Sequence, residues 1–296
     1  MNETPLSMPV LVTEGWDDYR LVDFGHGRKL ERFGPHLIDR PEEQAMGAPL
    51  LPAGEWQKAD AVFDGDAEDK EGRWRLAKGA PENFALQFEN LKFWGRFTPF
   101  RHMGFFPEQA AHWRWMERRI KARGGEFRLL NLFGYTGLAS LIAAKAGAHV
   151  THIDASKKAI AYARENQELS GLADKPIRWI TEDAVTFVQR EQRRGNTYDG
   201  ILLDPPKFGR GPNNETWHLF ENLPAHAEEC ISLLSDQPSF FILTAYAIRA
   251  SALSLHSLLA PLLKNRGGDL QSGELAVQAQ DGRLLSTSLF SRWSDS

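Results

Sequence analysis

The alternation of apolar and polar residues changes near residue 100. Before this point, glycines and prolines interrupt short segments in which apolar and polar residues alternate, such as residues 19–24 and 84–88. A period of two residues is typical of strands that bury one face. We therefore predict a small β-rich module in residues 1–100, joined to a second domain in residues 101–296.

Near the start of the second domain, residues 104–123 are expected to form a helix after Pro107. Pro107 lies near its start, a position where proline is favoured because its fixed φ suits a helix and its missing N–H is not needed. Trp113, Met116 and Ile120 recur at helical spacing. We expect these three side chains on the buried side of the helix.

From residue 127 onward, strand-like and helix-like segments alternate. The predicted strands are residues 127–133, 149–153, 177–180, 198–203 and 239–244, and the predicted helices are residues 137–146, 156–170, 184–194, 216–234 and 250–265. Regular alternation of this kind predicts a doubly wound, parallel sheet with right-handed crossovers. The last two extended segments flank Asp281-Gly282, a typical hairpin turn. The sequence thus predicts an α/β fold whose mostly parallel, seven-stranded sheet ends in an antiparallel hairpin.

A glycine-containing segment follows the first predicted strand of this sheet. It reads Asn131-Leu-Phe-Gly134-Tyr-Thr-Gly137 and leads into a helix. Glycines at this place let the backbone approach a ligand at the carboxyl edge of the sheet, where doubly wound folds bind nucleotides. The pattern G-x-G-x-x-G is absent, so a loop built around a pyrophosphate is not indicated.

Two acidic residues follow the next two predicted strands. Asp154 ends the second strand, where a carboxylate accepts hydrogen bonds from ribose hydroxyls and marks an adenosine-type cofactor with a free 2′-OH. Asp183 follows the third strand and precedes an apolar helix. It is either an adenine contact or a helix N-cap, and one residue can do both.

The fourth predicted strand ends in Asp204-Pro205-Pro206-Lys207-Phe208. Two successive prolines have fixed φ angles and no N–H donors, so they end the strand and make the loop rigid. This rigidity would hold the Asp204 carboxylate and the nearby backbone carbonyls in place. Phe208 would then offer a flat aromatic face.

Together, these motifs carry a family resemblance. NLFGYTG, HIDAS, EDA and LDPPKFGRG, in this order and spacing, resemble the motifs of class I S-adenosylmethionine-dependent methyltransferases. More narrowly, residues 100–293 resemble the large-subunit ribosomal RNA methyltransferases, which include cytosine-C5 and guanine enzymes. The resemblance implies S-adenosylmethionine as the cofactor and ribosomal RNA as the substrate.

The resemblance also implies a place for each motif residue around the cofactor. The residues implied for the methionine end are Phe133, Gly134, Tyr135, Thr136 and Gly137, with Asn131 opening the same motif. Those implied for the ribose and adenine are Asp154, Ala155, Asp183 and Ala184. Asp204 and Pro205 are implied for the reactive end.

The cysteine content bears on the reaction type. Methylation of carbon 5 of a pyrimidine needs a nucleophile, usually cysteine, that attacks carbon 6. In the C5 enzymes that this chain resembles, the cysteine follows the fifth strand, but residues 241–249 contain none. Cys230 lies in a predicted amphipathic helix and is expected to be an inert core thiol. A cysteine-independent mechanism is therefore favoured, with an exocyclic or ring nitrogen as the acceptor.

The motif after the fourth strand suits a nitrogen acceptor. Asp204 and a carbonyl fixed by Pro205 could accept N–H bonds and turn the nitrogen lone pair toward the methyl group. Phe208 could stack on a flipped base. We therefore predict Asp204, Pro205 and Phe208 as the catalytic residues.

Charge qualifies the RNA hypothesis. The net charge of −4 excludes a uniformly basic nucleic-acid binder, and 42% hydrophobic with 25% charged residues excludes disorder. Residues 71–130 nevertheless hold twelve basic and six acidic residues. We expect Arg118, Arg119 and Lys121 from this segment to contact RNA, although a solvated helix face would show the same charges.

Other functions stay open at this point. A methyltransferase acting on a small molecule or a protein side chain has the same cofactor motifs, and a catalytically silent RNA-binding protein is the non-enzyme alternative. A nicotinamide-dependent oxidoreductase is opposed by the absent third glycine and by the DPPKF sequence.

The remaining signals concern location and metals. One cysteine, no apolar stretch of about 20 residues and no basic leader predict a cytoplasmic protein without a membrane partner. No cluster of His, Cys and Asp has metal-ligand spacing, so no metal is expected. The sequence does not indicate the oligomeric state.

Overall fold

The computed structural model describes residues 6–65, 72–246 and 248–295, which form two compact units. The larger unit, here called the sheet unit, takes its described residues from 6–11, 112–275 and 288–295. The smaller unit, here called the β unit, takes them from 12–111 and 276–287. The division of the chain after residue 100 stays a prediction.

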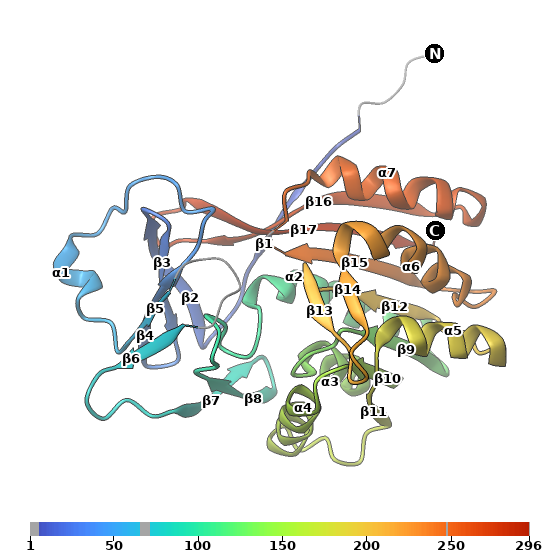
Figure 1. Ribbon diagram of the computed structural model, residues 1–296, viewed down its shortest axis with the longest axis horizontal. Coiled ribbons are helices and arrows are strands. Elements are labelled where there is room, and N and C mark those ends of the chain that lie inside the picture. Colours follow the sequence, from blue (N-terminus) through green and yellow to red (C-terminus); the bar gives the residue numbers. More distant parts are fainter. Residues whose placement is uncertain (1–5, 66–71, 247, 296) are drawn as a thin grey trace. The chain divides into compact units, whose positions relative to one another are not determined.

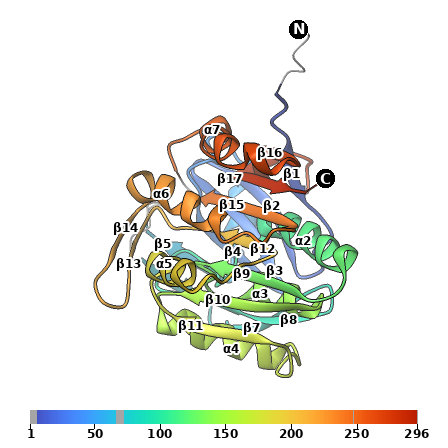
Figure 2. The same cartoon turned by 90° about the vertical axis from the view of Figure 1, so that its right-hand side faces the viewer.

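The sheet unit contains the predicted α/β sheet. In spatial order its strands are β1 (Val10–Thr13), β16 (Asp269–Gln278), β17 (Leu284–Ser294), β15 (Phe240–Tyr246), β12 (Gly200–Leu203), β9 (Phe127–Leu132), β10 (Ala148–Asp154) and β11 (Ile177–Thr181). Figure 2 shows β16 to β11 following one another in this order. Strands β9 to β12 and β15 are parallel, and β17 pairs antiparallel with β15. The predicted fold class is confirmed, with β1 as an additional strand beside the final hairpin.

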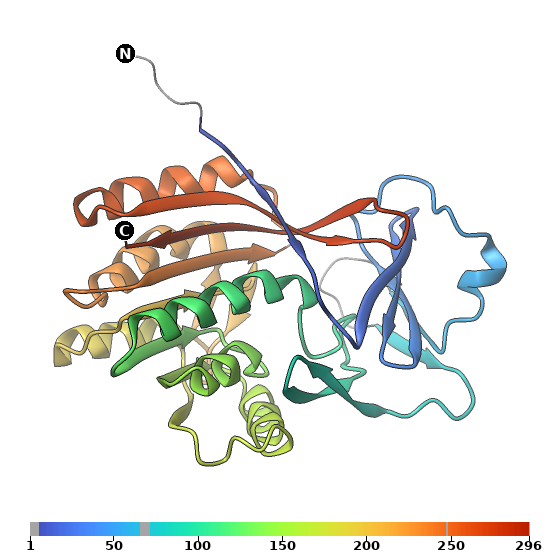
Figure 3. The same cartoon turned by 180° about the vertical axis from the view of Figure 1, so that it is seen from behind.

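Helices cover both faces of this sheet. On one face lie α2 (Ala110–Arg123), α3 (Leu138–Lys145) and α4 (Lys157–Leu169), which are nearest the viewer in Figure 3. On the other lie α5 (Ala184–Arg194), α6 (Leu219–Ser232) and α7 (Ala252–Leu263), visible in Figure 1. Coverage on both faces explains why the central strands are almost continuously apolar and buried.

The core beneath α5, α6 and α7 contains the single cysteine. Cys230 is fully buried there beside Ile231 and Leu234. Burial raises the pKa of its thiol well above the ordinary value, with the charge of Glu229 adding to the shift. The predicted core position of Cys230 is therefore confirmed, and the inertness of its thiol stays a prediction supported by this burial.

Two predicted helices begin later than expected. Residues 107–109 form a 3-10 turn, and α2 begins only at Ala110. Residues 216–218, predicted as the start of a helix, instead form β14 (Thr216–His218), which pairs with β13 (Phe208–Arg210). The turn between them is held by Glu215, whose carboxylate accepts hydrogen bonds from the backbone and side-chain nitrogens of Asn213 at 2.8 and 3.0 Å.

The β unit is β-rich, as predicted. Its five-stranded sheet contains β2 (Tyr19–Gly25), β3 (Arg28–Phe33), β4 (His36–Pro41), β5 (Ala61–Asp64) and β6 (Arg73–Leu76), with the short α1 (Ala53–Trp56) between β4 and β5. A separate hairpin consists of β7 (Asn83–Phe88) and β8 (Leu91–Arg96). Aromatic rings fill the core, where Phe105 contacts Phe33 and Phe93.

No helix among the described residues has the length and apolar character needed to cross a membrane.

The core of the β unit also contains a buried ionic cluster. Glu31 is fully buried and accepts hydrogen bonds from Arg40 Nε at 2.5 Å, Arg40 Nη2 at 3.0 Å and the Tyr19 hydroxyl at 2.9 Å. Lys29 Nζ lies 3.1 Å from a carboxylate oxygen of the buried Glu42. Such pairs are costly to break, because the remaining partner keeps an uncompensated charge in the core.

We predict that Glu31→Gln destabilises the protein by about 3 kcal/mol or more at pH 7. Burial favours a raised pKa for Glu31, but Arg40, Lys29 and Tyr19 outweigh it and lower the pKa. The carboxylate therefore contributes stability at neutral pH and loses it as the pH falls through that lowered pKa. Denaturant unfolding at pH 7 and in acid should show the difference between variant and wild type shrinking in acid.

The control is Asp64→Asn, which breaks the exposed pair between Asp64 and Arg75. This variant should change stability little, because water screens exposed pairs. Equal losses for the two variants would contradict the importance assigned to the buried cluster.

Candidate active site

The predicted site residues gather at one edge of the sheet in the sheet unit. The loop of residues 133–137 follows β9, Asp154 ends β10, Asp183 follows β11 and Asp204 follows β12. These strands are parallel and neighbouring, so all four segments leave the sheet at its carboxyl edge. This is the edge at which open α/β sheets bind ligands.

Asp154 joins two of these segments. Its Oδ2 accepts a hydrogen bond from the backbone N–H of Tyr135 at 2.9 Å, and its Oδ1 accepts one from the N–H of Ser156 at 2.8 Å. The carboxylate thus fixes both the loop of residues 133–137 and the turn that starts α4. Burial raises the pKa of Asp154, against the lowering effect of these two hydrogen bonds.

The conformation of the loop explains its glycines. A Cβ on Gly134 would lie 2.3 Å from Cε1 of His152, and one on Gly137 would lie 2.8 Å from the Trp179 ring. Gly137 also has a φ of 84°, in the region that disfavours other residues. The protein's own packing therefore requires these glycines, whereas the sequence suggested the close approach of a ligand.

A buried polar network supports the loop. Asn131 Nδ2 donates to Ser140 Oγ at 2.9 Å, and Ser140 Oγ lies 2.9 Å from Nδ1 of His152. Burial lowers the pKa of His152 to about 3, so the imidazole is neutral at pH 7. The described contacts of Asn131 thus stabilise the loop, and its assignment to the cofactor stays a prediction.

The next two loop residues are also held in place. Burial, together with the charge of Asp154, raises the pKa of the Tyr135 hydroxyl, which is neutral at physiological pH. Thr136 is buried, and its carbonyl accepts a hydrogen bond from Asn166 Nδ2 of α4 at 3.0 Å.

Asp183 is the N-cap of α5. Its Oδ1 accepts hydrogen bonds from the N–H of Thr186 at 2.8 Å and from the Thr186 hydroxyl at 2.9 Å. Ala184 begins the helix and is buried. The cap interpretation is confirmed, and the adenine contact of Asp183 and Ala184 stays a prediction, as does the contact of the half-buried Ala155.

Trp217 positions the loop that follows β12. Its indole Nε1 donates a hydrogen bond to the carbonyl of Pro206 at 2.7 Å, and its ring centroid lies 5.0 Å from that of Phe133. Trp217 is buried and therefore links the glycine-containing loop to the Pro-Pro loop. The sequence does not reveal this contact, although the alternation of polar and apolar residues in Thr216-Trp217-His218 is typical of a strand.

Phe208 lies on the other face of the same hairpin. It pairs with His218, whereas Gly209 pairs with Trp217. Because side chains alternate along a strand, Phe208 points away from the face that carries Trp217. Its side chain is 51% exposed, and its ring centroid lies 5.0 Å from that of His218. Its stacking on a flipped base beside Asp204 stays a prediction.

Two of the three basic residues on α2 that were expected to contact RNA form ion pairs within the protein, whereas Arg118 is exposed. Their contact with RNA stays a prediction. Arg119 pairs with Asp295 at 3.0 Å, and Lys121 pairs with Glu117 at 2.7 Å. Asp295 follows the end of β17, which is antiparallel to β15. Arg119 therefore lies at the amino edge of the parallel strands, opposite the candidate site.

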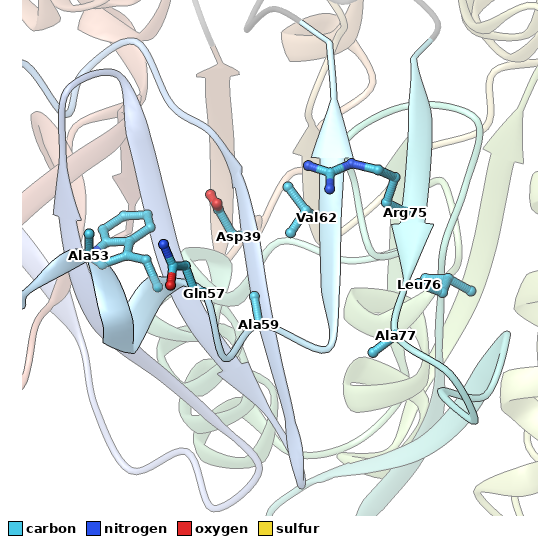
Figure 4. A pocket seen from close by; sticks show the side chains of 9 residues that line it. Asp39, Ala53, Gln57, Ala59, Val62, Arg75, Leu76 and Ala77 are labelled. Carbon is cyan, nitrogen blue, oxygen red and sulfur yellow. The ribbon is translucent and has the colours of Figure 1, made fainter.

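The β unit contains a separate pocket of about 510 Å³, shown in Figure 4. Its lining residues are Asp39, Ala53, Trp56, Gln57, Ala59, Val62, Arg75, Leu76 and Ala77. None of the predicted site residues lines it. Within the described part of the chain, no group of three or more His, Cys, Asp or Glu side chains could hold a metal ion.

One solved structure matches almost the whole chain. A S-adenosylmethionine-dependent methyltransferase from Agrobacterium tumefaciens is 49% identical, with a TM-score of 0.93, and the match covers 99% of this chain and 97% of that one. The chain belongs to the S-adenosylmethionine-dependent methyltransferases. The predicted enzyme class and cofactor are thereby confirmed, and the oxidoreductase and the catalytically silent binding protein are set aside.

Further comparisons match the fold and a part of the chain. SMU.776, solved in complex with S-adenosylhomocysteine (SAH), has the same fold at 18% identity and a TM-score of 0.72, over 93% of this chain and 75% of that one. A family profile described as "Conserved hypothetical protein 95" matches residues 110–234.

Curated relatives match a shorter part of the chain. The ribosomal RNA large subunit methyltransferase I of Shewanella denitrificans is 36% identical over 106 residues, which are 36% of this chain and 26% of that protein. The enzyme of the same name from Aeromonas salmonicida is 35% identical over 106 residues, with the same coverage. The chain thus spans about a quarter of the length of the curated relatives it matches.

We predict that Asp154→Ala removes most of the stabilisation by SAH. In the wild type, SAH at 100 times its dissociation constant should stabilise the folded state by about 2.7 kcal/mol. The variant loses the acceptor expected for the ribose and the hydrogen bond that holds Tyr135. Thermal unfolding with and without SAH measures the difference for each protein, independently of its starting stability.

Asp174→Ala is the matched control, because the Asp174 carboxylate is 76% exposed and lies in the turn before β11. It should keep the full SAH shift. An undiminished shift in Asp154→Ala would contradict the place assigned to Asp154.

Proposed function

We propose that the enzyme transfers the methyl group of S-adenosylmethionine to a nitrogen of a base in ribosomal RNA, without a cysteine nucleophile. Two findings support the substrate class: the names of the curated relatives and the exposed aromatic and basic hairpin beside the candidate site. The observation that carries the proposal is the rigid loop of residues 204–208, held through the hydrogen bond from Trp217 to Pro206.

The residues at the carboxyl edge fit the cofactor. Asp154 is half-buried at the end of β10, and each of its oxygens accepts one backbone N–H. A carboxylate oxygen can accept a further hydrogen bond, so both oxygens remain suited to ribose hydroxyls. S-adenosylmethionine supplies a methyl group on a positively charged sulfur, which makes the methyl carbon electrophilic.

The other predicted cofactor residues follow from the same geometry. The loop of residues 133–137 would hold the methionine end. Asp183 and Ala184 would border the adenine at the start of α5, where backbone N–H groups are not used within the helix.

The residues after β12 would orient the acceptor nitrogen. An amino group conjugated with an aromatic base is a poor nucleophile, because its lone pair is delocalised into the ring. The Asp204 carboxylate and the Pro205 carbonyl would accept its two N–H bonds and direct the lone pair toward the methyl carbon. Both acceptors belong to a loop that cannot rearrange cheaply, because prolines restrict its φ angles and Trp217 binds the Pro206 carbonyl.

The position of the cysteine supports transfer to nitrogen. Cys230 is the single cysteine of the sequence. Its side chain is fully buried, and burial raises the pKa of its thiol. A neutral thiol in the core cannot attack carbon 6 of a pyrimidine.

The proposal is tested by methyl transfer to unmodified ribosomal RNA. The RNA is isolated from cells lacking the gene, incubated with the enzyme and S-adenosylmethionine, and digested to nucleosides for mass spectrometry. We expect one nitrogen-methylated nucleoside with the wild type. Asp204→Ala should lower turnover at least about 100-fold, because it removes an acceptor at the reacting nitrogen, and should keep most of the SAH thermal shift.

Formation of 5-methylcytosine would contradict the cysteine-independent mechanism. An absence of RNA methylation by an enzyme that still binds SAH would contradict the RNA substrate and favour a small molecule or a protein side chain. Equal loss of SAH binding and turnover in Asp204→Ala would contradict the separation of the two functions.

Trp217→Phe provides a second prediction in the same assay. Phenylalanine keeps an aromatic ring but removes the N–H that binds the Pro206 carbonyl. The loop of residues 204–208 is then held less firmly at the acceptor nitrogen. We expect kcat to fall about 10- to 100-fold, with little change in SAH affinity. Steady-state kinetics and the SAH thermal shift measure the two effects.

The matched control is Trp293→Phe, because Trp293 Nε1 donates to the Gly267 carbonyl at the same distance of 2.7 Å. Trp293 lies near the end of β17, at the amino edge of the sheet. A similar fall in kcat for both variants would show a general loss of stability and would overturn the positioning role of Trp217.

A further inference from the structure

The β13–β14 hairpin, residues 208–218, presents two different faces. The inner face contains Trp217, which is 4% exposed and packs against Phe133 and His226. The outer face contains the cross-strand pair Phe208 and His218, whose rings meet edge to face. The outer pair is exposed, although aromatic rings gain most when they are covered. The two rings are therefore accessible to a ligand.

Basic side chains flank the outer face. Lys207 precedes Phe208, and Arg210 ends the same strand; both are exposed. No ion pair involving either is found among the described residues. The acidic residue of the hairpin, Glu215, is engaged by Asn213. The outer face therefore combines two rings with two available positive charges.

This combination is typical of surfaces that bind single-stranded nucleic acid. Bases stack on aromatic side chains, and basic side chains contact the phosphates between them. In a duplex the bases are already stacked on one another, so only an unpaired base can occupy such a ring. Rings that face each other across two paired strands, with a cation before and after Phe208, match the repeat of base and phosphate along a single strand.

The hairpin is held rigidly in this arrangement. Trp217 binds the Pro206 carbonyl, and the N–H of Leu219 donates to the Lys207 carbonyl at 3.1 Å. These two hydrogen bonds hold the base of the hairpin together. A surface that is already ordered loses little conformational entropy when it binds.

We propose that Phe208 and His218 stack an unpaired base next to the nucleotide that is methylated, while Lys207 and Arg210 contact the phosphates beside it. This proposal rests on the RNA substrate of the proposed function and deepens it. Phe208 then binds a flanking nucleotide, which replaces the stacking on the methylated base expected from the sequence, because Phe208 points away from the face that carries Trp217. The acceptor base would lie at Asp204 and Pro205.

The test compares two polyanions of equal length in fluorescence anisotropy. One is a labelled oligoadenylate of about twelve nucleotides, within the usual site size of such surfaces, and the other is the same ribose-phosphate chain without bases. The full-length enzyme, saturated with SAH, should bind oligoadenylate at least about tenfold more tightly, because only this chain can stack. Equal affinities would overturn the proposal.

Variants separate stacking from charge. Phe208→Ala should weaken oligoadenylate binding about 5- to 100-fold, the range expected for one stacked base, and leave binding of the abasic chain unchanged. Phe208→Trp should keep the affinity, because it retains a stacking ring. Since Phe208 is 51% exposed, these substitutions leave the core intact, which thermal unfolding will verify.

The double variant Lys207→Ala with Arg210→Ala should weaken binding of both chains. It should also flatten the salt dependence by about 1.4 units of log Kd per log salt, the value for two phosphate contacts on a single strand. Arg193→Ala is the matched control, because Arg193 is exposed in the last turn of α5. It should leave both affinities unchanged.

The outcomes separate this proposal from the proposed function. Oligoadenylate binding that follows the predicted pattern, without methylation of ribosomal RNA, supports the stacking surface and overturns the RNA methyltransferase assignment. Methylation of ribosomal RNA that is unaffected by Phe208→Ala, with unchanged oligoadenylate affinity, overturns the stacking surface alone.

Discussion

The hydrogen bond from the Tyr135 N–H to the Asp154 carboxylate is the interaction on which the candidate site depends. Phe133 and Tyr135 have positive φ angles of 55° and 51°, which are costly for residues with side chains. The bond offsets this cost and holds the loop against the neighbouring strand. The same carboxylate fixes the turn that starts α4 through Ser156. One side chain thus joins two of the segments that form the carboxyl edge of the sheet.

Much of the sheet unit could be predicted from the sequence. The spacing of apolar residues indicates each helix or strand, and the order of these elements along the chain indicates the parallel sheet. Helix α5 has the predicted bounds, since an apolar stripe follows the N-cap Asp183 and Gly195 ends the helix in a left-handed conformation. The residues at the carboxyl edge were predictable because each follows a short apolar strand. The sequence could not show why glycine is needed at positions 134 and 137. A side chain at these positions would clash with His152 and Trp179, which lie on other strands.

Long-range partners explain what the sequence could not reveal. The basic run on α2 has the pattern of an RNA-binding surface, yet Arg119 meets Asp295, 176 residues later in the chain. Nothing near Arg119 in the sequence indicates this partner. Similarly, Trp217 contacts the Pro206 carbonyl only because the β13–β14 hairpin folds the chain back on itself. Local patterns predict which residues are charged or apolar, and tertiary contacts decide which of them remain available.

The hairpin shows how a short element can serve two functions at once. Alternation along β14 places Trp217 on one face and His218 on the other, so a change to one face leaves the other in place. Gly209 lies opposite Trp217 on the neighbouring strand. The inner face can therefore fix the acceptor loop while the outer face stays open to a substrate. Because both faces share one backbone, a nucleotide bound outside would be held in a constant position relative to Asp204. Under the stacking proposal, this coupling would let the neighbour of the methylated nucleotide contribute to its selection.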